Sequence, residues 1–331
     1  MVVHYKNPWE HTTRSGLVPA GDHKLYISTS GPSRSPGTPV LIYFTGGGAP
    51  VPLHVRLQRL LSEVVRVYFY DRSGYDQSER IAGSGVVTAR DNARELYTLL
   101  TEGVKVEPPY ILVAHSYGGI IAREFLEICT KEYQKRGGQA CDPVAGMILA
   151  ESATELMYQL FSHIPPPDLE RLSEGIDYAK LTHAREESGL TKSEWERAME
   201  AIQRTVPGAQ REDNHSSGRE LAKLRQFERQ ILGDNPLSVI RCDMTKDFRV
   251  LYDAGVKKGQ GTGEERAKAK EFIETLELFD DELRFTQTRL SNSSRYRTFL
   301  EYGHDGVLRK PEIIVDEVKW ILQSMHRRAE E

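Results

Sequence analysis

The chain has 331 residues, of which 39% are hydrophobic and 28% are charged, and its formal net charge at pH 7 is −4. This composition is typical of a globular protein with a sizeable apolar core, and it excludes a largely disordered chain. Because no excess of positive charge is available to neutralise phosphate groups, we expect neither nucleic acid nor an anionic membrane as a partner.

The cysteine content and the first residues bear on cofactors and compartment. Three cysteines, Cys129, Cys141 and Cys242, occur without a CxxC pair or adjacent histidines, which argues against a disulfide framework and against a zinc site. The opening sequence MVVHYKNPWEHTTRSG lacks the pattern of a signal peptide, and no apolar run is long enough to cross a bilayer. We therefore expect a cytoplasmic protein that uses no metal or other cofactor.

Short apolar segments alternate with amphipathic ones in the first half of the chain. A β-hairpin around the turn GDHK is expected at residues 17–30. Continuous apolar runs then predict buried strands at residues 40–44, 65–70, 110–114 and 144–150. Helical spacing of apolar residues predicts helices at residues 57–64, 88–100 and 118–130. This alternation predicts an α/β fold, with a mostly parallel sheet covered by helices on both faces.

The pattern changes after residue 155. A polar, mostly helical stretch continues to about Gly233 and contains an expected loop at residues 204–220. Regular elements are then expected as strands at residues 236–242 and 296–301 and as helical regions at residues 264–290 and 311–325. We therefore predict a core of residues 1–155 and 235–331, with residues 156–234 forming an inserted helical cap.

Ser116 lies between the expected strand at residues 110–114 and the helix that follows it. A serine acts as a nucleophile when an imidazole accepts its proton and a sharp turn exposes its hydroxyl group. Ala114 and Gly118 are small residues two positions to either side, as such a turn requires. The arrangement matches the nucleophile elbow G-x-S-x-G, with alanine in place of the first glycine. We predict that Ser116 is a nucleophile.

The glycine-rich turn Thr45-Gly46-Gly47-Gly48 follows another expected strand. A serine nucleophile generates an oxyanion that backbone N–H groups can stabilise. In the layout that contains such an elbow, one donor comes from a turn of this kind and the other from the residue after the nucleophile. We predict Gly47 and Tyr117 as the two donors.

His304 is the candidate base, because it is the one histidine of ten that follows a late strand in a glycine-flanked loop, Gly303-His304-Asp305-Gly306. The neighbouring His115 is expected to point away from the pocket and to serve in packing. A carboxylate at the end of a strand should orient the imidazole. Glu151 is favoured, and Asp243 and Asp247 are the alternatives.

Several segments together resemble the α/β-hydrolase superfamily over nearly the whole chain outside the insert. They are TGGG, YDRSGYDQS, PPYILVAHSYGG, VAGMILAES and GHDG. The resemblance implies a Ser116–His304–Glu151 triad, since one branch of the superfamily carries its acid after the strand that follows the nucleophile. Some lactonases of the superfamily use a glutamate there. Serine at position 116 argues against haloalkane dehalogenases and epoxide hydrolases, which place aspartate there.

These features predict a small-molecule partner, and an ester, lactone or thioester of a small apolar metabolite as the substrate. Two alternatives remain open. The acyl-enzyme could be intercepted for cyclisation or acyl transfer, or the protein could be a ligand receptor with slow turnover, as some plant hormone receptors of the superfamily are.

Overall fold

The structure is a computed structural model that describes residues 7–83, 85–137 and 142–330, so Cys141 lies outside the described residues. Within them, one eight-stranded sheet has the order β1-β2-β4-β3-β5-β6-β7-β8. The strands are β1 (Arg14–Pro19), β2 (Lys24–Ser30), β3 (Val40–Phe44), β4 (Val67–Tyr70), β5 (Tyr110–His115), β6 (Val144–Ala150), β7 (Leu237–Arg241) and β8 (Ser294–Thr298). β1 and β2 pair antiparallel with their neighbours, and the other strands run parallel. The predicted mostly parallel sheet is confirmed.

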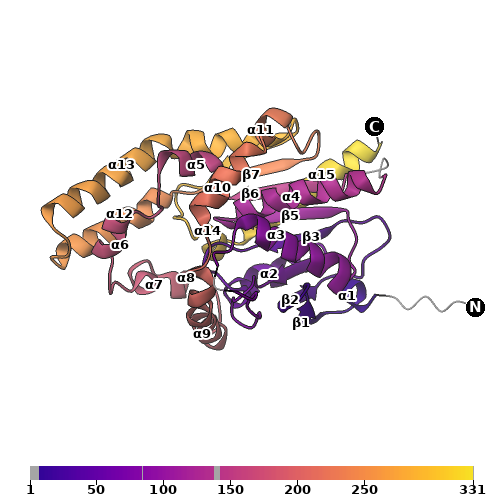
Figure 1. The fold of residues 1–331 in the computed structure, drawn as a ribbon, viewed down its shortest axis with the longest axis horizontal. Coiled ribbons are helices and arrows are strands. Elements are labelled where there is room, and N and C mark those ends of the chain that lie inside the picture. The colour runs from indigo at the N-terminus through magenta and orange to yellow at the C-terminus, as the bar shows by residue number, and fades with distance from the viewer. Residues whose placement is uncertain (1–6, 84, 138–141, 331) are drawn as a thin grey trace, which may run out of the picture.

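Helices cover both faces of the sheet (Figure 1). One face is covered by α3 (Ala89–Thr98) and α4 (Gly118–Lys135), and the other by α2 (Val55–Leu61) and α15 (Glu312–Glu330). Shorter helices of this part are α1 (Pro8–His11), η1 (Val51–His54), η2 (Leu99–Gly103), η3 (Thr286–Leu290) and α14 (Gly306–Arg309). None of the helices in the described ranges is both long and apolar enough to span a membrane.

The central strand β5 shows why the apolar runs are continuous. Leu112 and Ala114 pack in the core that includes α3 and α4, whereas Ile111 and Val113 pack in the core that includes α2 and α15. Successive side chains of a strand point to opposite faces, so a strand covered on both sides must be apolar at every position. The end of β5 is therefore fixed at the middle of the sheet, where Ser116 follows.

A helical insert lies between β6 and β7, as predicted. It contains α5 (Glu155–Leu160), α6 (Pro167–Leu172), α7 (Tyr178–Leu181), α8 (Ala184–Glu187), α9 (Lys192–Ala209), α10 (Asn214–Lys223) and α11 (Gln226–Arg229). Two further helices, α12 (Met244–Lys257) and α13 (Gly263–Phe285), follow β7 and pack against α6 and each other. Figure 1 shows α6, α12 and α13 together at one end of the molecule. The division into core 1–155 and 235–331 and cap 156–234 stays a prediction.

The prediction of a loop at residues 204–220 was wrong, because most of this segment belongs to α9 and α10. Pro207 lies inside α9, where a missing N–H normally disfavours a helix. Tertiary packing outweighs that cost. Thr205 and Gly208 are buried against the loop after β4, and a Cβ atom added to Gly208 would lie only 2.5 Å from the carbonyl oxygen of Gly74.

Candidate active site

Ser116 occupies the turn between β5 and α4 and has a φ angle of +54°. This left-handed conformation is unfavourable for a residue with a side chain, so the surroundings must hold it. Its carbonyl oxygen accepts hydrogen bonds from the N–H groups of Gly119 and Ala153, at 3.0 Å and 2.9 Å. A Cβ atom on Gly118 would lie 2.4 Å from the carbonyl oxygen of Phe44, so the turn requires glycine there. Packing around the elbow therefore fixes an otherwise strained serine.

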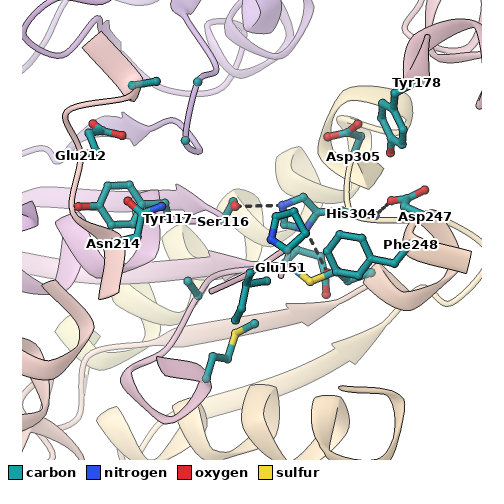
Figure 2. Close-up of a pocket in the computed structure, with 18 of the residues that line it drawn as sticks. Ser116, Tyr117, Glu151, Tyr178, Glu212, Asn214, Asp247, Phe248, His304 and Asp305 are labelled. Carbon is teal, nitrogen blue, oxygen red and sulfur yellow. Dashed lines mark hydrogen bonds and ion pairs between the residues drawn. The ribbon is translucent and has the colours of Figure 1, made fainter. Parts of the chain in front are cut away.

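His304 lies in the loop between β8 and α14, and its side chain is 24% exposed. Its Nε2 atom lies 2.9 Å from Ser116 Oγ, and its Nδ1 atom lies 3.4 Å from Glu151 Oε2 (Figure 2). The backbone N–H of His304 donates to the carboxylate of Asp247 over 2.6 Å. The structure thus brings Ser116, His304 and Glu151 together in the order that nucleophilic catalysis requires.

Glu151 follows β6 directly, is buried, and has a φ angle of +46°. Its Oε1 atom accepts a hydrogen bond from the N–H of Cys242 over 2.9 Å, which leaves Oε2 facing the imidazole. The two alternative acids lie elsewhere. Asp243 caps α12 through the N–H of Lys246, and Asp247 binds the backbone of the histidine loop rather than its ring. Among the three candidates, only Glu151 reaches the Nδ1 atom, and its role as the triad acid stays a prediction.

Arg284 stabilises the ionised form of Glu151. It is fully buried on α13, with Nη2 3.6 Å from Glu151 Oε2 and Nε 3.1 Å from Asp280 Oδ1. Burial raises the pKa of Glu151, but the charge of Arg284 and the hydrogen bond from His304 outweigh it and hold the pKa well below its usual value. Glu151 is therefore ionised.

The pKa of His304 moves in the opposite direction. Burial lowers the pKa of the imidazole, whereas the hydrogen bond and the negative charge of Glu151 raise it, and the net result is a raised pKa. A raised pKa means that the imidazolium is stabilised relative to the neutral ring. This is the charge state that would form once His304 accepted a proton from Ser116.

The two predicted oxyanion donors, Gly47 and Tyr117, both line the cavity above Ser116. Within residues 7–83, 85–137 and 142–330, neither backbone N–H group has a hydrogen-bond acceptor. The adjacent N–H of Gly48, in contrast, donates to the hydroxyl group of Tyr75 over 2.9 Å. Two unpaired N–H groups beside a serine hydroxyl fit an oxyanion site, and their assignment stays a prediction.

A cavity of about 680 Å³ opens over Ser116. Its apolar lining comes mainly from the insert and from α12, and includes Met157, Tyr158, Ile164, Pro165, Ile202, Val206, Met244, Phe248 and Leu251. In Figure 2, Glu212 and Asn214 lie on the Tyr117 side of the serine, and Asp247 and Asp305 lie on the His304 side. No lysine or arginine is among the described residues that line it. In the described part of the chain, no group of three or more His, Cys, Asp or Glu side chains could hold a metal ion.

Comparison with known families agrees with this arrangement. A model of the alpha/beta hydrolase family matches residues 41–317, which include the elbow, the insert and the histidine loop. The chain belongs to the alpha/beta hydrolase family. This confirms the family expected from the sequence.

Two curated relatives match nearly the whole of this chain. A protein of Gibberella zeae named "AB hydrolase superfamily protein" is 33% identical over 336 residues, covering 96% of this chain and 98% of the relative. "Probable transporter efuK" of Hormonema carpetanum is 31% identical over 327 residues, covering 98% of this chain but 44% of the relative. The chain thus spans less than half the length of the second protein.

Solved structures of low sequence identity share the fold. One is a serine hydrolase involved in carbazole degradation, the CarC enzyme, with a TM-score of 0.55 and 13% identity over 94% of this chain and 99% of that one. Because the sequence identity is this low, the likeness shows that the two proteins share a fold and shows nothing finer.

His115 makes a contact with the histidine loop that the sequence does not predict. The residue does not line the cavity, as expected, yet its Nε2 atom donates to the backbone carbonyl oxygen of His304 over 2.9 Å. Burial lowers the pKa of His115 to about 3, so its ring is neutral. No local pattern signals this contact, because the two residues are 189 positions apart. Arg284 was missed for the same reason.

Proposed function

We propose that this protein is a serine hydrolase that cleaves an ester, lactone or thioester of a small, uncharged, largely apolar metabolite. The observation that carries the proposal is the 2.9 Å contact between Ser116 Oγ and His304 Nε2 at the base of a largely apolar cavity. A hydroxyl group next to a neutral imidazole, with a carboxylate on the far side of the ring, is the arrangement that activates serine.

Acylation starts with attack of Ser116 Oγ on the substrate carbonyl carbon, while His304 Nε2 accepts the serine proton. The N–H groups of Gly47 and Tyr117 stabilise the oxyanion of the tetrahedral intermediate. When the intermediate collapses, the bond to the alcohol or thiol breaks, and the imidazolium protonates this leaving group. Throughout the step, Glu151 stays ionised and stabilises the imidazolium.

Deacylation repeats the sequence with water as the nucleophile. His304 accepts a proton from the water, whose oxygen attacks the acyl carbon, and the same N–H groups bind the new oxyanion. Collapse of this intermediate releases the carboxylic acid and returns the proton to Ser116. A carboxylic acid as the final product distinguishes this hydrolase from an enzyme that transfers or cyclises the acyl group.

The substrate class follows from the cavity lining. Apolar side chains dominate it, and its charged groups are carboxylates, such as those of Glu212, Asp247 and Asp305. With no basic side chain among the described lining residues to pair with a carboxylate, an anionic substrate would lose its hydration without compensation. We therefore expect uncharged acyl esters to be cleaved faster than esters of dicarboxylic acids.

Covalent labelling with a fluorophosphonate tests the nucleophile. The wild-type protein should be labelled and should hydrolyse activated acyl esters, while Ser116→Ala should do neither. Ser193→Ala, which changes an exposed serine on α9, should behave like the wild type and serves as the control. An unlabelled wild-type protein, or full labelling of Ser116→Ala, would refute the proposal.

A further inference from the structure

Arg72 binds the glycine-rich turn at residues 45–48 through hydrogen bonds to its backbone. It lies just after β4, and its side chain is 1% exposed. Its Nη1 atom donates to the carbonyl oxygen of Thr45 over 2.8 Å, and its Nη2 atom donates to the carbonyl oxygen of Gly46 over 2.9 Å. The planar guanidinium presents several donors in a fixed arrangement, so it can hold two successive peptide groups at once. The next N–H in the chain is that of Gly47.

Glu212 belongs to the insert, where it lies in the connection between α9 and α10. It accepts hydrogen bonds from both Arg72 and Tyr75. Its side chain is 4% exposed, and its Oε1 atom accepts from Arg72 Nε over 2.6 Å. Its Oε2 atom accepts from the hydroxyl group of Tyr75 over 2.7 Å, and that hydroxyl accepts from the N–H of Gly48. The turn is thus held on both sides of Gly47.

We propose that Arg72 and Glu212 are positioning residues that aim the N–H of Gly47 at the reacting carbonyl, so that the oxyanion site depends on the placement of the insert. This inference rests on the proposed function. A buried arginine without its carboxylate would carry an uncompensated charge. Loss of Glu212 should therefore weaken the hydrogen bonds from Arg72 to the carbonyl oxygens of Thr45 and Gly46. Displacement of the insert would have the same effect.

Alternatively, Arg72 and Glu212 could serve only to anchor the insert to the core. Asp76 provides a matched control for this alternative. The fully buried carboxylate of Asp76, on the same loop as Arg72, pairs with Arg197 and Arg204 of α9. Among the described residues, Asp76 makes no hydrogen bond or ion pair with the turn at residues 45–48. Asp76→Asn therefore weakens the link between core and insert and leaves the turn untouched.

The test compares Glu212→Gln, Arg72→Lys and Asp76→Asn. Hydrogen exchange of the peptide spanning residues 43–50 should accelerate in the first two variants and stay at the wild-type rate in the third. With an uncharged activated ester, kcat should fall about ten-fold in Glu212→Gln and about a hundred-fold in Arg72→Lys, with little change in KM, because oxyanion contacts form only in the transition state. Thermal melting should verify that each variant is folded.

Two results would overturn the inference. One is wild-type exchange at residues 43–50 in Glu212→Gln, whatever the activity of the wild type. The other is a loss of kcat in Glu212→Gln that is no larger than in Asp76→Asn. Failure of the proposed function is distinguishable, because it would appear as absent labelling and turnover in the wild-type protein itself.

Discussion

His115 Nε2 lies 2.9 Å from the backbone carbonyl oxygen of His304, and the two imidazole rings are 4.8 Å apart. The residue that precedes Ser116 thus holds the loop that carries the base. Since burial lowers the pKa of His115 to about 3, the ring stays neutral and its Nε2–H is the donor. The elbow and the histidine loop are therefore joined by two contacts, one through the reacting hydroxyl group and one through the neighbouring side chain.

Replacement of His115 tests this link. His115→Phe removes the donor and leaves a part-buried carbonyl oxygen unpaired, which costs about 1 kcal/mol and lets the loop shift. We expect kcat for an activated ester to fall by about ten-fold or more, because small displacements of a catalytic group slow the reaction strongly. His115→Gln, whose amide can still donate to His304, should retain most of the activity. Equal losses in both variants would contradict the positioning role.

The acid can be assigned by comparing Glu151→Ala with Asp243→Ala. Glu151 faces the imidazole, so its loss should reduce kcat by roughly a thousand-fold or more. Asp243 caps α12, so its loss should leave kcat close to the wild-type value and lower the free energy of unfolding by about 1 kcal/mol. Steady-state kinetics and urea unfolding measure the two effects. The reverse ranking of kcat would show that the acid was misassigned.

The pH dependence of kcat/KM should report the ionisation of His304. The base must be neutral to accept the serine proton, and its pKa is raised above the ordinary value of 6.5. Activity should therefore be low in acid and rise with pH through a midpoint above 6.5. In Glu151→Gln the charge that raises the pKa is gone while burial still lowers it, so the residual activity should have a lower midpoint. A midpoint that does not move would contradict the pairing.

Asp71 should lower stability as the pH rises. It is fully buried, and burial raises the pKa of its carboxyl group to about 8, while Oδ2 has no hydrogen-bond partner among the described residues. Between its unfolded pKa and this value, the native state keeps a proton that the unfolded state releases. The free energy of unfolding should therefore fall with increasing pH, by at most about 1.4 kcal/mol per pH unit.

Asp71→Asn removes this titration and keeps an oxygen that can accept the N–H of Val51, as Asp71 Oδ1 does over 2.7 Å. The stability of the variant relative to the wild type should increase steadily from about pH 5 to about pH 8. Urea unfolding at several pH values measures the difference. A constant difference across this range would mean that Asp71 is ionised in the folded protein.

The strand segments and the elbow could be predicted because both depend on short-range patterns. A strand buried on both faces must be apolar at every position, and the turn after β5 requires small residues two positions to either side of Ser116. The prediction of a loop at residues 204–220 was wrong for the opposite reason. Its helical state depends on contacts of Thr205 and Gly208 with a loop more than a hundred positions away, and a local pattern carries no information on them.

Sequence patterns alone predict the fold, the place of Ser116 at a strand end, and a short set of candidates for its partners. The three-dimensional contacts separate these candidates by position, and the role of each in catalysis stays a prediction. The tertiary structure directed Glu151 to the imidazole through the N–H of Cys242, assigned Asp247 to the backbone of His304, and placed Arg284 beside the buried carboxylate. These contacts join groups that are far apart in the chain and close together in space. Because the groups are buried, the electrostatic interactions between them are strong enough to set the charge of each group.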